Sequence, residues 1–273
     1  IALYGVFSGT ESGLYERDWA KNVAIIDGGG VVSPLRNSLN TTVSTVVDGV
    51  TVQNGINQAG ANGNGNGGGM IINGGTKVRN CVFRGNRTQN AKNGAAIHCN
   101  VGTFTIENCL FYDNTSSGNG GAVQVGGGCT ATITNCTFAD NTAAKPGGAI
   151  GLGNNTSNVN IYNCVAWHNK GGSAYNSYGQ NDDMNGGGTV IARFTSIQTQ
   201  STKFTDGDDE QVTFLTEEKK PQFVEGGYQL AEGSPCIDAG NASLLANTEF
   251  DLAHNARLSG KQLDQGAYEA DQG

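Results

Sequence analysis

The chain has 273 residues, of which 43 are Gly, 31 are Asn and 4 are Pro, and its formal net charge at pH 7 is −8. Abundant Gly destabilises helix interiors and argues against a helical bundle, while the scarcity of Pro and the lack of a three-residue Gly period exclude collagen. A hydrophobic content of 37% argues against disorder, and the acidic charge argues against nucleic-acid binding. No apolar run reaches the length of a membrane helix. The composition therefore indicates an all-β protein with many turns.

The main feature of the sequence is an internal repeat. An early copy fits residues 47–52, and a Gly-Gly-Met-Ile element follows at 68–71. Four clearer copies read Val/Ile-x-Asn-Cys-x-Phe/Ala-x-x-Asn, at residues 78–86, 106–114, 133–141 and 161–169. A repeat of this length holds two or three short strands and cannot bury its own apolar face, so successive repeats must stack. We predict a single-stranded, right-handed parallel β-helix of about eight coils over residues 1–200, because parallel crossovers are right-handed.

Equivalent positions of the repeats are expected to form columns along the stack. Strand alternation places Val78, Cys81 and Phe83 and their counterparts on the inner face. The two Asn positions of each repeat are expected to form ladders in which the amides bond from coil to coil. The first predicted ladder is Asn80, Asn108, Asn135 and Asn163, and the second is Asn86, Asn114, Asn141 and Asn169.

The chain has seven Cys, so at least one thiol has no partner in the chain. Four of them occupy one inner column, where free Cys behaves as a small hydrophobic residue. We expect these four Cys side chains to stack as reduced thiols. A metal site in this column is disfavoured, because ligands in a straight ladder cannot converge tetrahedrally.

The last quarter of the chain differs in charge. Residues 1–200 carry 11 Lys and Arg against 10 Asp and Glu, whereas residues 201–273 carry 5 against 14. We expect 201–273 to form acidic final coils, loops and a C-terminal cap within the same domain, since solenoids need capped ends. A structural charge network is expected to tie this tail to the last coil, formed by Asp251, His254, Arg257, Asp264 and Glu269.

Several motifs resemble a known group of proteins. The Gly-Gly-Ala-Ile/Val and Phe-x-x-Asn elements resemble the repeats of polymorphic outer-membrane proteins and of other β-helical surface proteins with a pectate-lyase-like fold. Residues 4–30 resemble the opening of secreted β-helix proteins of Gram-negative bacteria, with Val6 in place of a Gly, and 233–242 with 251–269 resemble their closing segment. The resemblance implies an extracellular or outer-membrane-associated protein, exported by a signal outside this segment. It implies no one activity, because the group ranges from lyase-like to adhesin-like proteins.

Outward columns beside the repeats offer candidate binding residues. Exposed Tyr and Trp present flat apolar faces to sugar rings, and Arg holds carboxylates bidentately. We therefore expect an acidic or aromatic-stacking glycan to bind at Arg79, Arg84, Glu107, Tyr112, Tyr162 and Trp167. The alternative is an ordinary solvated β-face with cross-strand pairs such as Arg79 with Glu107.

A further column holds Asp113, Asp140 and His168. Two carboxylates on successive coils would lie about 5 Å apart, near the spacing of retaining glycosidases, and His can serve as an acid or base. The alternative is that these Asp residues simply stabilise a turn. A lyase is disfavoured, because the repeats lack a cage of converging carboxylates for Ca²⁺. Acidic stretches at 182–185 and 206–210 could bind Ca²⁺, but they lack EF-hand spacing, so no cofactor is assigned.

We expect a monomeric, secreted or cell-surface β-helix protein that binds a polysaccharide or a host or cell-surface glycan. A polysaccharide-degrading enzyme, a hydrolase rather than a lyase, is the alternative, and a purely structural or adhesin segment is a third. Whether the chain is catalytic stays open at this point.

Overall fold

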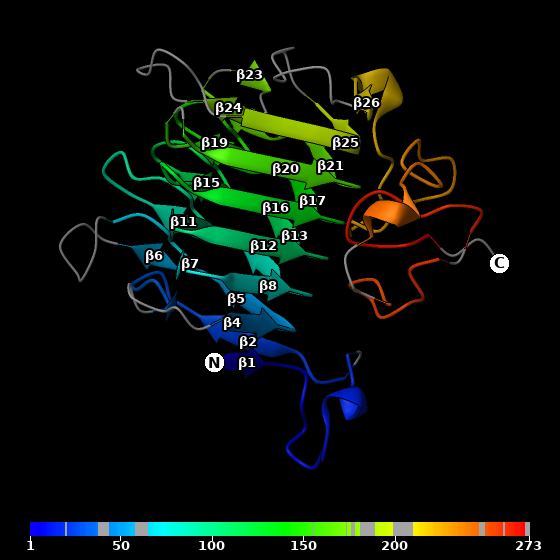
Figure 1. Ribbon diagram of the computed structural model, residues 1–273, viewed down its shortest axis with the longest axis horizontal. Helices are drawn as coiled ribbons and strands as arrows, with labels where there is room; N and C mark the ends of the chain where they lie inside the picture. Colours follow the sequence, from blue (N-terminus) through cyan, green and yellow to red (C-terminus); the bar gives the residue numbers. More distant parts are fainter. Residues whose placement is uncertain are drawn as a thin grey trace.

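The computed structural model describes residues 1–19, 21–37, 44–57, 65–154, 156–172, 174–175, 178–180, 189–198, 210–245, 249–258 and 260–270. The described strands form a parallel β-solenoid, as predicted, with almost no helix (Figure 1). It has about five complete turns of four short strands each, with partial turns at both ends, whereas about eight coils of two or three strands were expected.

Two long stacks of parallel strands form most of the solenoid. The first, here called the β8 stack, contains β1 (Ala2–Tyr4), β4 (Thr45–Asp48), β8 (Thr76–Arg79), β12 (Thr103–Glu107), β16 (Thr130–Thr134) and β20 (Asn158–Tyr162). The second, the β9 stack, contains β2 (Ala24–Asp27), β5 (Val50–Gln53), β9 (Val82–Arg84), β13 (Leu110–Tyr112), β17 (Thr137–Ala139) and β21 (Val165–Trp167). The long strand β25 (Thr189–Ile197) pairs with both stacks, and β26 (Glu210–Phe214) pairs with β25.

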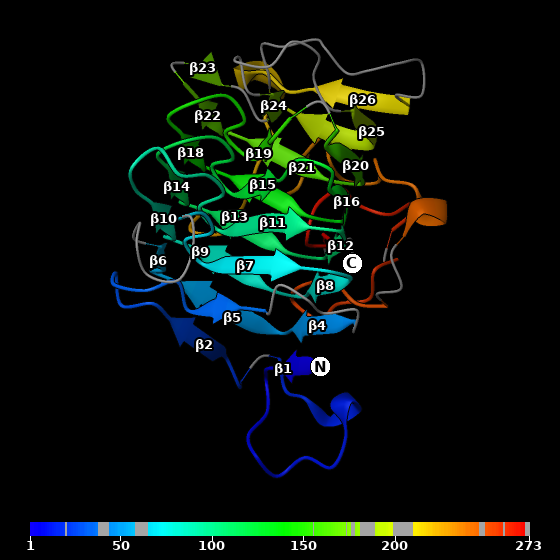
Figure 2. The same cartoon turned by 60° about the vertical axis from the view of Figure 1, so that its left-hand side comes forward.

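Two smaller stacks complete each turn (Figure 2). One contains β3 (Leu35–Arg36), β7 (Met70–Asn73), β11 (Ile97–Val101), β15 (Val123–Val125), β19 (Ile150–Leu152) and β24 (Tyr178–Gln180). The other contains β6 (Ile56–Asn57), β10 (Arg87–Thr88), β14 (Thr115–Ser116), β18 (Thr142–Ala143), β22 (Lys170–Gly171) and β23 (Ala174–Tyr175). In the described part of the chain, three short 3-10 helices lie outside the stacks, at Leu14–Glu16, Glu217–Lys219 and Ala242–Leu244.

Each turn of the solenoid has two bends at which the backbone adopts a positive φ, and these bends determine where the repeated side chains lie. Between the β8 and β9 stacks, the first Asn of each repeat adopts the left-handed conformation, with φ between 51° and 53°. Asn tolerates this region better than most residues. After the β9 stack, the second bend is made by Gly85, Asp113, Asp140 and His168, again with positive φ. The column of predicted catalytic residues is thus also a column of bend residues.

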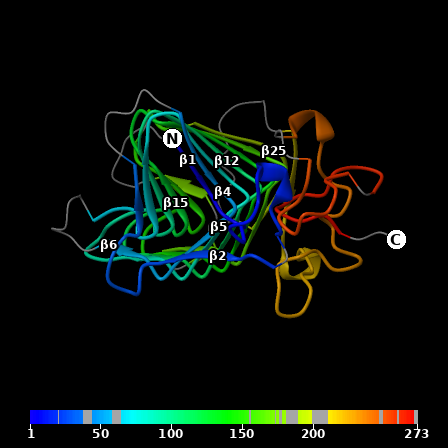
Figure 3. The same cartoon turned by 90° about the horizontal axis from the view of Figure 1, so that it is seen from below.

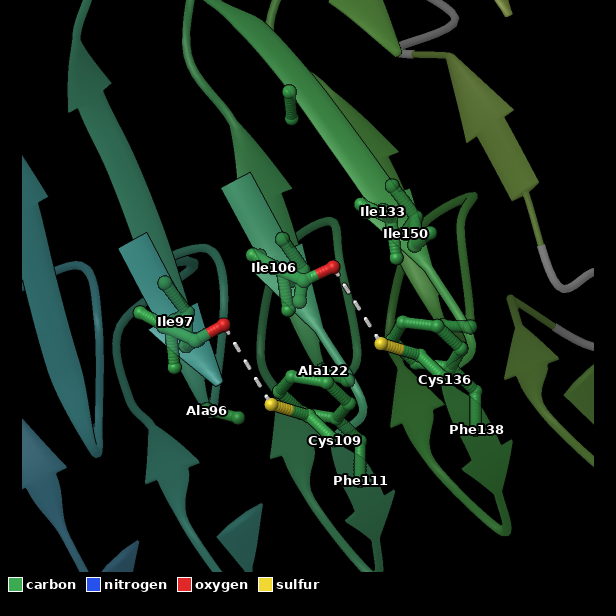
Figure 4. Close-up of a cluster of buried hydrophobic side chains, with 14 of the residues drawn as sticks. Ala96, Ile97, Ile106, Cys109, Phe111, Ala122, Ile133, Cys136, Phe138 and Ile150 are labelled. Carbon is green, nitrogen blue, oxygen red and sulfur yellow. Dashed lines mark hydrogen bonds between the residues drawn. The ribbon is translucent and has the colours of Figure 1, made fainter. Parts of the chain in front are cut away.

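The inner columns form the core as predicted. Val78, Cys81 and Phe83 are fully buried, and their counterparts in the next two repeats are too. The ring of Phe111 stacks between Phe83 and Phe138, with centroid separations of 5.1 and 4.8 Å. Figure 4 shows the Phe and Cys side chains repeating from turn to turn inside the solenoid.

The four Cys of the inner column are free thiols, as expected. Each thiol points to backbone carbonyls rather than to another sulfur, and that of Cys136 lies 3.7 Å from the Ile106 oxygen (Figure 4). Burial raises the pKa of the Cys109 thiol well above its usual range. A buried, protonated thiol is a poor nucleophile, which agrees with a packing role.

The second Asn ladder forms as predicted. Asn86 donates to Asn114, Asn114 to Asn141 and Asn141 to Asn169, over 2.9–3.0 Å, and all four residues are fully buried. Each oxygen also accepts from the backbone N–H of the preceding Asn. The ladder thus pairs buried backbone groups that no strand satisfies.

The first ladder forms only in part. Asn108 donates to the Asn80 oxygen over 2.6 Å, whereas the side chain of Asn135 has no hydrogen-bond partner among the described residues. Asn163 instead exchanges hydrogen bonds with the backbone of Asn241, far along the chain. This ladder differs because another part of the chain covers it.

That covering part is the closing segment, defined here as the described residues of 215–270. It runs along the flank of the solenoid where the β8 and β9 stacks meet (Figures 1 and 3). The backbone N–H of Ala267 donates to Thr137 Oγ1 over 2.9 Å, and Arg257 donates to the Asn108 oxygen. The segment therefore contacts several successive turns.

A buried network of charged side chains holds the closing segment together. Arg257 is almost fully buried and lies 3.1 Å from a Glu269 oxygen. Asp264 accepts from the backbone N–H groups of Asp238 and Ala270, and Asp251 accepts from those of Asn255 and Glu269. Burial raises the pKa of Glu269 to about 8, even though Arg257 opposes the shift. His254, which the sequence grouped with these residues, instead stacks on Phe250 and Trp19.

Candidate functional site

A groove of about 590 Å³ lies between the solenoid and the closing segment. The solenoid wall is formed by Leu110, Tyr112, Asp140, Trp167 and His168. The opposite wall is formed by Phe223, residues 226–229 and Tyr268. The repeat places the first wall, because successive turns bring equivalent positions of β13, β17 and β21 side by side.

Aromatic rings dominate the groove. Trp167 is almost fully buried, and the ring of His168 stacks on it with a centroid separation of 4.5 Å. Tyr228 from the closing segment packs against Tyr112 at 4.9 Å and against Phe223 at 5.5 Å. The contacts of Tyr228 with Tyr112 join the two walls of the groove.

Asp140 is the central polar group. The hydroxyl of Tyr228 donates to one of its oxygens over 3.2 Å, and Nδ1 of His168 lies 3.5 Å from the other. Nε2 of His168 lies 3.4 Å from a Glu217 oxygen. Burial and the charge of Asp140 raise the pKa of the Tyr228 hydroxyl, which keeps it protonated as a donor.

Asp113 lies one turn away from Asp140. Its neighbour Tyr112 is directly opposite Ala139 in the sheet, so the two Asp residues occupy equivalent positions on adjacent turns. Partial burial, followed by the charge of Asp140, raises the pKa of Asp113. Asp113 is exposed and does not line the groove.

The structure brings together four of the residues singled out in the sequence, namely Tyr112, Asp140, Trp167 and His168. Arg84 lies beside them, since it donates to the Tyr112 hydroxyl over 3.0 Å and to Gln53 over 2.8 Å.

The other three predicted binding residues, Arg79, Glu107 and Tyr162, lie on the β8 stack. Arg79 pairs with Asp48 at 2.9 Å, and Glu107 is buried and pairs with Lys77 at 2.8 Å. Arg79 and Glu107 are opposite each other in register, but the structure shows these two ion pairs in place of the expected Arg79–Glu107 pair. Tyr162 is half-buried on β20.

Arg79 lines a second, smaller hollow of about 230 Å³. The N-terminal residues Arg17 and Trp19 and the closing-segment residues Phe250 and His254 also line it. The guanidinium of Arg17 lies over the Trp19 ring at 4.4 Å and also pairs with Asp48. Both arginines of this hollow therefore share one carboxylate.

Sequence reasoning missed the whole closing-segment wall of the groove. Phe223 and Tyr228 belong to no repeat, so no periodicity places them. One sequence feature could have indicated Tyr228: it directly follows Gly226 and Gly227. Gly pairs mark turns, and a turn can present an aromatic side chain outward.

Within the described part of the chain, no three His, Cys, Asp or Glu side chains gather so as to hold a metal ion. Of the candidate Ca²⁺ stretches, all of 182–185 and all of 206–210 except Glu210 lie outside the described residues.

The groove and the fold define a parallel β-solenoid with an aromatic side groove. Residues 108–126 and 135–153 match the Chlamydia polymorphic membrane protein repeat. No curated protein matches the chain, and no solved structure does so. The matched repeats are the turns that supply Tyr112 and Asp140, and they point to a bacterial surface or outer-membrane β-helix protein. Among the described residues, no helix is long and apolar enough to span a membrane.

Proposed function

We propose that this protein is a bacterial surface β-helix protein that binds a glycan in the groove between the solenoid and the closing segment. One observation carries the proposal: aromatic side chains from two distant parts of the chain line one groove together with Asp140, which accepts a hydrogen bond from Tyr228. Ligand sites are typically apolar and aromatic clefts with a few placed polar groups. Sugars match this combination, since their rings have apolar faces and their rims carry hydroxyls.

The test is a glycan array followed by calorimetry with the best ligand. We expect Tyr112→Ala and Tyr228→Ala each to weaken binding by about 2 kcal/mol, or roughly 30-fold, as for aromatic residues at the centre of an interface. Tyr15→Ala is the matched control, because Tyr15 is 86% exposed and lies outside the groove. Binding that persists in the Tyr112→Ala/Tyr228→Ala double variant would show that the groove is not the site.

A glycoside hydrolase is the second candidate, favoured by the two carboxyl groups on adjacent turns. Partial burial, followed by the charge of Asp140 on the adjacent turn, raises the pKa of Asp113, as expected for the acid of an acid and base pair. A reducing-sugar assay on the bound glycan tests it, with Asp113→Asn and Asp140→Asn expected to abolish product. A wild-type protein that binds the glycan and releases no reducing ends is a binding protein only.

A further inference from the structure

The charges around the groove differ from those the sequence suggested. The sequence suggested that Arg79 and Arg84 bind an acidic glycan, but Arg79 pairs with Asp48 on the β8 side, as Arg17 also does. Among the described residues that line the groove there is no Lys or Arg, and Asp140 is the carboxylate. Arg84 is the adjoining cation, and its donors are directed to Gln53 and to the Tyr112 hydroxyl.

The carboxylate of Asp140 can accept further hydrogen bonds. Its side chain is 42% exposed. One of its oxygens accepts a hydrogen bond from the Tyr228 hydroxyl, and Nδ1 of His168 lies 3.5 Å from the other oxygen. An ionised carboxylate has about four acceptor positions, so some face the open groove. Asp113 adds a second negative charge one turn away, and none of the ion pairs of the described residues involves it.

The aromatic faces favour the same kind of ligand. The face of a Tyr or Trp ring is negative, so it attracts a cation as well as stacking on an apolar surface. Tyr112, Trp167 and Tyr228 line the groove together with Asp140, and Tyr228 contacts its carboxylate. A group that is cationic, donates N–H bonds and is carried on a stackable ring therefore fits each of these features.

We infer that the groove selects an amino sugar with a free ammonium group, held by a charge-assisted hydrogen bond to Asp140 while its ring stacks on Tyr112 and Tyr228. This inference rests on the proposed function and adds the class of sugar. A quaternary ammonium fits less well, because it has no N–H to donate to the carboxylate. A uronate polymer is disfavoured, since its carboxylates would face Asp140 and Asp113.

The experiment compares three oligosaccharides by calorimetry with the complete chain: a glucosamine tetramer, its fully N-acetylated counterpart and a galacturonate tetramer. A charge-assisted hydrogen bond predicts that the glucosamine tetramer binds about tenfold more tightly than the acetylated one. Asp140→Asn should remove this preference and leave the affinity for the acetylated tetramer within about twofold. Glu232→Gln, which removes the same charge at an exposed position of the closing segment, should leave the preference intact.

The outcomes separate this inference from the proposed function. Equal or tighter binding of the acetylated or galacturonate tetramer overturns the amino-sugar inference and leaves glycan binding standing. Loss of both glucosamine and acetylated binding in Asp140→Asn means that Asp140 shapes the groove without contacting an ammonium, which also overturns the inference. If neither these tetramers nor an array of other glycans binds, the proposed function itself fails.

Discussion

At the scale of single residues, the two repeated Asn positions have different environments. The Asn86 column is buried within the solenoid, and each amide bonds to the next turn and to a carbonyl of the preceding one. The Asn80 column lies at an outer bend, where its amides bond partly to the closing segment. Asn108, Asn135 and Asn163 are fully buried as well, so the two columns differ in their hydrogen-bond partners and not in their burial.

Asn114 gives the sharpest test of the buried ladder. It accepts from the Asn86 amide and backbone and donates to Asn141, so Asn114→Ala orphans buried groups on both sides. We expect the free energy of unfolding in urea to fall by about 3 kcal/mol. Asn158→Ala is the control, because this Asn is exposed and should shift stability by about 0.5 kcal/mol or less. Equal effects of the two substitutions would refute a ladder-specific role.

The repeats explain why the ladders could be predicted and their difference could not. Both Asn positions recur with the same spacing, so sequence alone predicts that equivalent residues stack. The two ladders differ because Arg257 and Asn241 contact only the first one. These two residues belong to non-repeated sequence and lie about 150 and 80 residues after their partners Asn108 and Asn163. For the same reason Tyr112, Asp140, Trp167 and His168 were identifiable as neighbours, while Tyr228 was not.

At the scale of elements, the closing segment contains the buried guanidinium of Arg257 beside two carboxyl groups, those of Glu269 and Asp264. Arg257 compensates one negative charge, but Glu269 and Asp264 both lie near it, and burial raises the pKa of both. Burying one cation with two ionised carboxylates is unfavourable, so Glu269 keeps a proton near neutral pH. The proton can be detected as a pH dependence of stability.

Glu269 has a folded-state pKa of about 8, above its ordinary value of 4.5. Between these two pH values the unfolded chain releases this proton and the folded chain retains it. The contribution of Glu269 to the free energy of unfolding is therefore fully present below pH 4.5, and it is progressively lost as the pH rises to about 8. We expect Glu269→Gln to make the urea-unfolding free energy less dependent on pH across this window, while the exposed Glu232→Gln leaves the slope unchanged. If Glu269→Gln keeps the wild-type pH dependence of the unfolding free energy, Glu269 is not the group that retains this proton.

At the scale of the whole molecule, the solenoid has an open N-terminal edge in the described structure. Strand β2 pairs with β5 alone, and Ile25 on it is 50% exposed, close in sequence to the exposed Val23. Unpaired edges with apolar side chains are templates for pairing with another chain. The 273-residue chain should therefore self-associate weakly as its concentration rises.

Sedimentation velocity over a concentration series tests this edge. Ile25→Lys should lower the association, because a charged side chain on an edge strand opposes strand pairing. Val101→Lys is the control, since Val101 is equally exposed but lies on β11, which is paired on both sides. A chain that stays monomeric at every concentration, or one for which both variants act alike, would contradict the prediction.

The position of the closing segment also determines how the molecule unfolds. In an isolated solenoid each turn touches only its neighbours, so the stack can fray turn by turn from either end. Here one continuous segment joins Asn241 to Asn163, Ala267 to Thr137 and Arg257 to Asn108. The closing segment is thus attached to three successive turns, so the loss of one of these turns strains its attachments to the other two. We therefore expect these three turns to resist load along the solenoid axis together rather than to separate one at a time.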